Sequence, residues 1–271
     1  MKYKAIALDL DGTLKTSDKK ISSKTKSKLI ELSKRGIKII LASGRPTAGI
    51  IKEANELELD KTSGYILSFN GARITEYPSY NIMYDKTYGK DYITKIYNRA
   101  KEYNLGVLTY EKDDIITSDD DQWIQEESDI NHMHLKRVDN FLEYVNHDVN
   151  KLLLTGKPEY VASIVDEFKK PYEGKLSIYR SAPFFIEVMA NNIDKGQSLD
   201  ALMKELELTS ENLIAFGDGY NDLPMIEYAG LGVAMKNGCE EVLNGANEVT
   251  LSNDEDGIYV TLSRLEKEGL L

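Results

Sequence analysis

Two carboxylates, Asp9 and Asp11, follow a short apolar run near the start of the chain and stand directly before Gly12. Residues two apart on an extended strand project to the same side, so we expect both carboxylates to point into one space. Neighbouring carboxylates repel each other, and a shared proton or a bound cation must compensate. Mg²⁺ takes oxygen ligands and commonly binds one or two carboxylates together with a substrate phosphate. Considered alone, the same residues also fit an ordinary polar turn.

Three further apolar runs end in polar residues, at Ser43, Asn70 and Asp218. If all of these runs are parallel strands of one sheet, their carboxyl ends emerge at the same edge, which is where ligands bind in open α/β sheets. Asp218 would then supply a third carboxylate for the same cation. The convergence of four strand ends predicts one site more strongly than any single motif does.

Cationic and N–H groups near these strand ends point to an anionic ligand. Ser43, Gly44 and Arg45 stand where a strand passes into a helix, and a helix N-terminus binds anions through its free N–H groups. Ser43 would also serve as a simple helix cap. Lys195 opens a later helix, where the helix dipole disfavours a cation. A bound phosphate explains that position, and a solvated surface lysine is the alternative.

The segment "GDGYND" places Asn221 and Asp222 at the start of a helix, just after Asp218. Acidic residues at a helix start are ordinary caps, so Asp222 adds little by itself. The P-loop pattern is absent, and the segment lacks the third glycine of the dinucleotide-binding fingerprint. A nucleotide-cofactor site is therefore not indicated.

The elements that must position these residues alternate between strands and helices. Short apolar runs predict strands over 3–10, 37–43 and 65–70, and a serine cap followed by an amphipathic pattern predicts a helix over 24–35. This alternation is typical of βαβ units and a parallel sheet.

The alternation stops near Pro78 and returns after Asn191. We predict an α/β fold whose parallel-sheet core comprises residues 1–83 and 188–271, with an α+β domain inserted at 84–187. Within the insertion, the runs 105–110 and 115–118 predict a hairpin.

The composition excludes some classes of function. The formal net charge is −11, and the charge is negative in both the insertion and the remainder, so we expect no nucleic-acid partner and no electrostatic attachment to anionic membranes. No apolar stretch approaches the roughly 20 residues that span a bilayer. Cys239 is the single cysteine, which fits a reducing compartment, and we expect a cytoplasmic protein.

The motifs "DLDGT", "ASGR", "NGA", "DKG" and "GDGYND", in this order, resemble those of the haloacid dehalogenase superfamily of phosphatases. The position and size of the insertion resemble the C2 cap of the Cof-type branch. The resemblance implies a Rossmann-like core that carries the site and a cap domain that closes over it and selects the substrate.

The resemblance also implies roles for individual residues. Asp9 would be the nucleophile that forms an aspartyl-phosphate, and Asp11 the general acid and base. Asp9, the main-chain carbonyl of Asp11 and Asp218 would hold Mg²⁺. Ser43 and Lys195 would bind the transferring phosphoryl oxygens. Gly44 and Asn221 are expected beside the same phosphoryl group, and the supporting positions are Gly12, Arg45, Asn70, Gly71 and Asp222.

The chain is therefore expected to be a Mg²⁺-dependent phosphatase of a small phosphorylated metabolite. A phosphotransferase or sugar-phosphate mutase would use the same aspartyl-phosphate and pass the phosphoryl group to another hydroxyl. A phospho-accepting regulatory module is a third reading, which the acid at Asp11 disfavours, because a signalling switch gains nothing from rapid hydrolysis.

Overall fold

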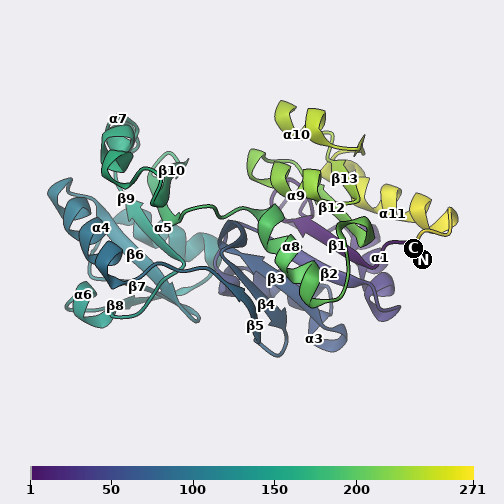
Figure 1. Ribbon diagram of the computed structural model, residues 1–271, viewed down its shortest axis with the longest axis horizontal. Coiled ribbons are helices and arrows are strands. Elements are labelled where there is room, and N and C mark those ends of the chain that lie inside the picture. Colours follow the sequence, from purple (N-terminus) through teal and green to yellow (C-terminus); the bar gives the residue numbers. More distant parts are fainter. Residues whose placement is uncertain (1) are drawn as a thin grey trace. The chain divides into compact units, whose positions relative to one another are not determined.

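A computed structural model describes residues 2–271 of the chain. The chain forms two compact units (Figure 1). The first comprises residues 2–84 together with Asp194–Leu271, and the second is Asp85–Ile193. The second unit ends at Ile193 because the strand over residues 185–190 belongs to its sheet, whereas the boundary at 187 that we set from the sequence falls inside this strand.

The first unit is built on one eight-stranded sheet of order β14-β13-β12-β1-β2-β3-β4-β5. The strands from β14 to β3 pair in parallel, and β4 pairs with β3 in the antiparallel sense. The sheet therefore joins segments from both ends of the sequence (Figure 1). Its strands are β1 (Ala5–Asp9), β2 (Lys38–Ala42), β3 (Gly64–Ser68), β4 (Arg73–Tyr77), β5 (Ile82–Asp85), β12 (Leu213–Gly217), β13 (Leu231–Ala234) and β14 (Glu248–Val249).

Strand β1 is apolar throughout because it is buried on both faces, as parallel strands covered by helices are. Ile6 and Leu8 belong to one hydrophobic cluster, while Ala5 and Ala7 belong to a second one on the other face of the sheet. The helices of this unit are α1 (Ser23–Lys34), α2 (Ile51–Glu56), α3 (Leu59–Thr62), α8 (Lys195–Glu205), α9 (Leu223–Tyr228), α10 (Glu240–Gly245) and α11 (Gly257–Lys267).

The second unit is a six-stranded sheet of order β10-β11-β9-β6-β7-β8 with four α-helices. The predicted hairpin is present as the antiparallel pair β6–β7. Its elements are α4 (Lys90–Glu102), β6 (Gly106–Glu111), β7 (Asp114–Thr117), α5 (Gln122–Asn131), β8 (His134–Arg137), α6 (Phe141–Tyr144), β9 (Lys151–Thr155), α7 (Pro158–Lys169), β10 (Leu176–Ala182) and β11 (Phe185–Ala190).

The α/β class is confirmed, but the prediction of a parallel sheet is incomplete. Strands β4 and β5 form an edge that the sequence pattern did not reveal, and β4 runs antiparallel to β3. The reversal follows from a tight turn over Phe69–Gly71, in which Asn70 has φ +53° and Gly71 has φ +104°.

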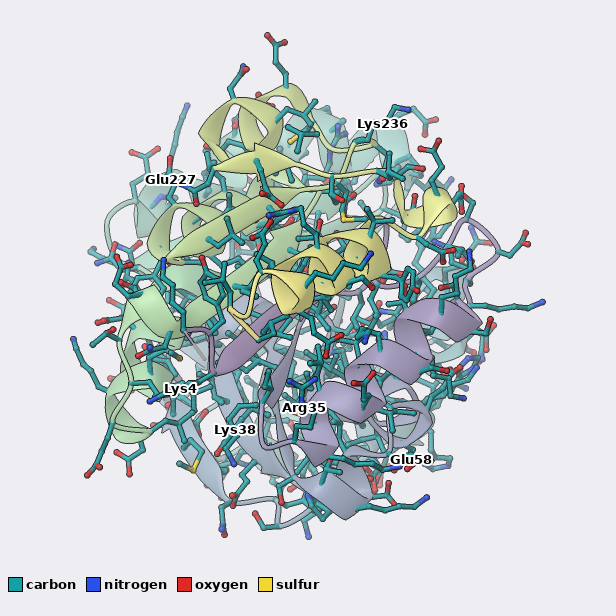
Figure 2. All side chains as sticks on the ribbon, turned by 90° about the vertical axis from the view of Figure 1, so that its right-hand side faces the viewer. Lys4, Arg35, Lys38, Glu58, Glu227 and Lys236 are labelled. Carbon is teal, nitrogen blue, oxygen red and sulfur yellow. The ribbon has the colours of Figure 1, made fainter. Side chains whose placement is uncertain are left out.

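The surface of the first unit carries charges of both signs. In Figure 2 the labelled side chains Arg35, Lys38 and Glu58 lie on the same face of the molecule. Neighbouring charges pair there, as Lys34 does with Glu58 at 3.0 Å. Among the described helices, none combines the length and the apolarity needed to cross a membrane.

Substitution of Phe168 tests how much core packing stabilises the second unit. It is fully buried and meets the ring of Tyr103 edge to face, with 5.6 Å between ring centroids. We expect Phe168→Ala to lower the free energy of unfolding by about 3–5 kcal/mol, because the cavity left behind adds to the lost burial. Tyr160→Ala, on the same helix but 40% exposed, should cost less than about 1 kcal/mol. Urea unfolding of both variants measures this, and equal losses would contradict the packing described.

Candidate active site

A fully buried lysine lies at the carboxyl end of β1. Lys195 is the first residue of α8, whose N-cap is Asp194, and its side chain is 0% exposed. The ammonium nitrogen Nζ lies 2.7 Å from Asp9 Oδ1 and 2.5 Å from Asp222 Oδ1, and it also donates to the carbonyl oxygen of Ala42 at 3.2 Å. These three acceptors explain why a cation occupies the first turn of this helix.

Asp222 is held from its other side by backbone groups. Its Oδ2 accepts hydrogen bonds from the N–H groups of Asp218 at 3.0 Å and Gly219 at 2.9 Å. The residue is 1% exposed, and a side chain at position 217 would overlap its carboxylate, which explains the glycine there. Asp222 is therefore a buried part of the site, although its sequence position suggested little more than a helix cap.

Asp218, which follows β12, is oriented by the loop after β1. The hydroxyl of Thr13 donates to Asp218 Oδ1 at 2.6 Å. Gly12 has φ +92°, and a Cβ atom at this position would overlap the Asp218 carboxylate. The close approach of this loop to Asp218 thus requires glycine both for the backbone angle and for space.

Asp9, Asp218 and Asp222 form a cluster able to hold a metal ion. Each offers a carboxylate oxygen, and these oxygens all lie within 4.8 Å of one another. Hard divalent cations prefer such oxygen ligands. Two of the three carboxylates contact the ammonium of Lys195, and the third lies beside them, so a bound cation would offset the remaining negative charge.

The charge balance of the cluster shifts its acid–base equilibria. Burial and the charge of Asp222 raise the pKa of the Asp9 carboxyl to about 8, although Lys195 acts in the opposite direction. Burial raises the pKa of Asp218 to about 6, although the hydrogen bond from Thr13 lowers it. Burial also lowers the pKa of Lys195, but Asp222 and Asp9 outweigh this and raise it above its ordinary value, so the ammonium stays charged.

The Asp11 side chain lies outside this cluster. Its Oδ2 accepts two hydrogen bonds from the guanidinium of Arg45, from Nε at 3.0 Å and from Nη2 at 2.6 Å. Strand β1 ends at Asp9, so the alternation rule that we applied to both aspartates does not extend to Asp11. The two carboxylates therefore have different partners: Asp9 pairs with the buried ammonium of Lys195, and Asp11 pairs with Arg45 and, at 3.7 to 3.9 Å, with the ammonium groups of Lys19 and Lys15.

The remaining expected residues gather around the turns after β2 and β3. Ser43 is buried, and its Oγ accepts a hydrogen bond from the N–H of Arg45 at 3.2 Å. The next helix is a 3-10 helix that begins only at Thr47, with Pro46 as its N-cap, so the expected helix start at Ser43–Arg45 and the cap role of Ser43 are wrong. Its carbonyl accepts from the N–H of Asn70 at 3.0 Å. Asn221 Nδ2 donates to Asn70 Oδ1 at 3.1 Å, and a Cβ atom on Gly44 would lie 3.1 Å from the same oxygen.

Gly71 brings this region close to the lysine-bearing helix. It has φ +104°, and a Cβ atom there would overlap Ser198 Oγ and the carbonyl of Asp194.

All the site residues that we predicted from the sequence lie in the first unit. They stand at the carboxyl ends of β1, β2, β3 and β12 or on the segments beside them. Thr13 and the carbonyl of Ala42 were not among the predicted site residues. Thr13 stands in the "DLDGT" motif and could have been found there, whereas a backbone carbonyl leaves no signal in a sequence.

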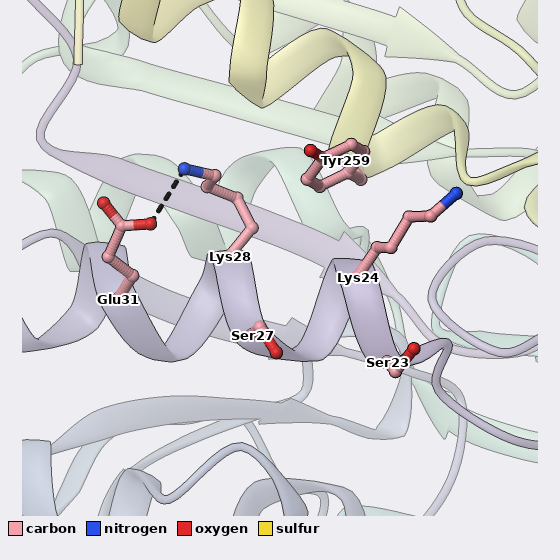
Figure 3. Close-up of a pocket in the computed structure, with 6 residues that line it drawn as sticks. All are labelled: Ser23, Lys24, Ser27, Lys28, Glu31 and Tyr259. Carbon is pink, nitrogen blue, oxygen red and sulfur yellow. Dashed lines mark hydrogen bonds and ion pairs between the residues drawn. The ribbon is translucent and has the colours of Figure 1, made fainter.

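A separate groove of about 440 Å³ lies between α1 and α11 (Figure 3). Its lysines already have partners, since Lys28 pairs with Glu31 at 2.8 Å and with Glu266 at 2.9 Å, and Lys24 pairs with Asp256 at 3.0 Å. The carboxylate cluster, in contrast, combines burial with uncompensated negative charge. The cluster is therefore the better candidate for chemistry.

The contribution of the buried Lys195 ammonium to stability can be tested by removing the charge. Lys195→Met leaves Asp9 and Asp222 buried without their cation, and we expect the free energy of unfolding to fall by about 3–5 kcal/mol. Lys204→Met, at the other end of α8, breaks an exposed pair with Asp200 and should cost less than about 1 kcal/mol. Chemical denaturation compares the two, and partial recovery of stability is expected when Asp222→Asn is added to Lys195→Met. Similar stability of the two single variants would contradict the role assigned to Lys195.

The raised pKa of Asp9 predicts a pH dependence of stability. The folded-state pKa of about 8 lies above the ordinary value of 3.8. The protonated Asp9 carboxyl therefore contributes to the free energy of unfolding at low pH, and this contribution is lost as the pH rises through 8. In a chelator, the native protein should lose stability relative to Asp9→Asn between pH 5 and 8, with a slope of up to about 1.4 kcal/mol per pH unit. Denaturant titrations across this range measure it, and a constant difference would argue against the shift.

Comparison with known proteins places the chain in a family. Residues 6–262 match the family model of the haloacid dehalogenase-like hydrolases. The 5-amino-6-(5-phospho-D-ribitylamino)uracil phosphatase YitU of Bacillus subtilis is 31% identical over 263 residues, which cover 93% of this chain and 94% of that protein.

Solved structures agree with this assignment. A haloacid dehalogenase-like hydrolase from Bacteroides thetaiotaomicron is 40% identical and superimposes with a TM-score of 0.93 over 97% of this chain and 100% of that one. The subclass IIB sugar phosphatase BT4131 is 25% identical, with a TM-score of 0.77 over 99% and 100% of the two chains. The chain therefore belongs to the haloacid dehalogenase-like hydrolases, in the Cof-type branch, and is a phosphatase.

Proposed function

We propose that the protein is a Mg²⁺-dependent phosphomonoesterase that hydrolyses a small phosphorylated metabolite, such as a sugar phosphate, through an aspartyl-phosphate. The observation that supports this most directly is the cluster of Asp9, Asp218 and Asp222 around the buried ammonium of Lys195. A stability role alone does not account for three acidic groups in one partly buried place, because burial of uncompensated charge is costly.

The cluster has the donor chemistry that Mg²⁺ requires. In this proposal Asp9, Asp218 and the main-chain carbonyl of Asp11 hold the ion, and Asp222 supports it. The ion would supply positive charge against the developing negative charge of the phosphoryl group. Its presence would also keep Asp9 ionised, which nucleophilic attack requires.

Asp9 would attack the phosphorus atom with a carboxylate oxygen. The new bond joins that oxygen to phosphorus as the ester P–O bond breaks, and Asp11 gives its proton to the leaving oxygen. Asp11, now a carboxylate, then takes a proton from water, and the resulting hydroxide attacks phosphorus to release orthophosphate and regenerate Asp9. The separate environments of the two aspartates support this division of labour, because only Asp9 contacts the ammonium.

Lys195 and Ser43 would bind the phosphoryl oxygens that do not leave, and Lys195 would exchange one of its three present acceptors for a phosphoryl oxygen. Lys195 already lies 2.7 Å from Asp9, so its charge is placed beside the atom that would attack. Gly44 and Asn221, which lie around Asn70, would contribute N–H donors on the opposite side. Fixed donors of this kind stabilise the charge of the transition state without reorganisation.

The relatives indicate the class of substrate. One is named as a phosphatase of a phosphorylated ribityl compound and another as a sugar phosphatase. Both names describe a phosphoester on a polyhydroxylated carbon chain, and we propose a substrate of this class for the present protein. The second unit, residues 85–193, would serve as the cap domain and select among such compounds.

The first experiment is orthophosphate release from glucose 6-phosphate, ribose 5-phosphate, glycerol 3-phosphate, flavin mononucleotide and pyridoxal phosphate, with Mg²⁺ or with a chelator. We expect turnover that requires Mg²⁺ and that falls by at least about 10³-fold in Asp9→Asn, because the nucleophile is lost. Asp60→Asn, an exposed aspartate in α3, is the matched control and should retain activity.

The outcomes separate the proposal from its alternatives. Transfer of phosphate to an added sugar without orthophosphate release would favour a phosphotransferase or mutase. A stable phospho-protein without turnover would favour a regulatory module. Undiminished activity of Asp9→Asn would show that the nucleophile is a different residue.

A further inference from the structure

We propose that Asn237 and Asn253 are positioning residues for Asp11, acting through the backbone of the loop that carries it. This inference rests on the proposed function, in which Asp11 protonates the leaving group. Both residues belong to the C-terminal segment and lie more than 220 positions from this loop along the chain. In the described hydrogen bonds, neither residue contacts a carboxylate of the cluster.

The first attachment is made at the residue next to Asp11. Asn237 Nδ2 donates to the carbonyl oxygen of Gly12 at 2.8 Å. The Oδ1 atom of the same amide accepts a hydrogen bond from the backbone N–H of Asn253 at 3.1 Å. Because one end of the amide faces a donor and the other an acceptor, its orientation is fixed.

The second and third attachments follow further along the loop. Asn253 Nδ2 donates to the carbonyl of Lys15 at 2.9 Å. Asp254 accepts from both the backbone N–H and the hydroxyl of Ser17, at 2.8 and 2.7 Å. The loop after β1 is thus bonded at three places to the C-terminal segment. Asn237 precedes α10 and β14 in the sequence, and Asn253 and Asp254 follow β14.

Bonds within the loop do not replace these attachments. The N–H of Leu14 donates to the carbonyl of Asp9, and the N–H of Lys15 to that of Leu10. Those two bonds close the turn locally. The bonds to Asn237, Asn253 and Asp254 join the backbone of the loop to the C-terminal segment, and the hydroxyl of Thr13 joins the loop to Asp218. On the other side, Arg45 holds the Asp11 carboxylate, so the backbone and the side chain of the acid are restrained by different partners.

A functional consequence follows from the precision that proton transfer requires. Misplacement of a reacting group by about 1 Å can reduce the rate by on the order of 10²-fold. Residues that lock a catalytic side chain indirectly are therefore expected to affect the chemical step. Loss of either amide should displace the acid while leaving Asp9 and Asp222, which Lys195 holds, in place.

The test compares two classes of leaving group in Asn237→Ala and Asn253→Ala. A sugar alkoxide needs a proton from Asp11 as the P–O bond breaks, whereas 4-nitrophenolate leaves as a stable anion without one. We expect kcat/KM to fall about tenfold or more for the sugar phosphate that turns over fastest in the panel, and less than threefold for 4-nitrophenyl phosphate. A merely structural defect would lower both equally.

Asn212→Ala is the matched control. Its side chain also donates to a distant backbone carbonyl, that of Lys2 at 3.0 Å, but it precedes β12 and lies at the opposite end of that strand from Asp218. Its kcat/KM should be unchanged for both substrates. Thermal unfolding of each variant establishes that it is folded, and Ser17→Ala provides a milder disturbance of the same loop if either asparagine variant is unstable.

Equal losses for both substrates, or no loss for either, in folded variants would overturn the positioning role. Asp11→Asn distinguishes this failure from failure of the proposed function. If Asp11→Asn selectively loses activity toward the sugar phosphate while the asparagine variants do not, the inference about Asn237 and Asn253 is wrong and the proposed role of Asp11 stands. If Asp11→Asn retains that activity, the assigned acid itself is wrong.

Discussion

The candidate site depends on one buried ammonium group placed between two buried carboxylates. Lys195 neutralises part of the charge of Asp9 and Asp222, and without it the low-polarity interior would not accept both acids. Its position on the first turn of α8 makes that helix a fixed part of the site. The arrangement still leaves excess negative charge beside Asp218, which is the condition that favours binding of a divalent cation.

Parallel strands make this arrangement possible. Asp9, Ser43 and Asp218 come from segments far apart in the sequence, yet each lies at or directly after the carboxyl end of a strand in the same sheet. Because parallel strands end at one edge, side chains from remote segments meet there without special loop geometry. Glycines at 12, 71 and 217 then allow the turns to approach the carboxylates and α8 closely.

The two aspartates of the first motif lie in different surroundings. Asp9 is buried beside an ammonium, whereas Asp11 is more exposed and bound to a guanidinium. Two carboxylates in distinct environments can act as nucleophile and as acid in one reaction. The loop that follows Asp9 is itself held by amides from the C-terminal segment, so the backbone around Asp11 is bonded to residues near the end of the chain.

The sequence by itself determined the α/β class and the inserted second domain, because buried strands are continuous apolar runs. It also indicated candidate site residues, because the polar groups at the ends of these runs stand out. The tertiary structure decided what local spacing does not encode. It showed that Asp11 turns toward Arg45 after β1 ends, that Asp222 is a buried partner of Lys195, and that β4 reverses direction. The first two depend on contacts between distant segments, and so do the bonds from Asn237 and Asn253, whereas the reversal of β4 depends on the turn over Phe69–Gly71. Such contacts arise only when the chain has folded.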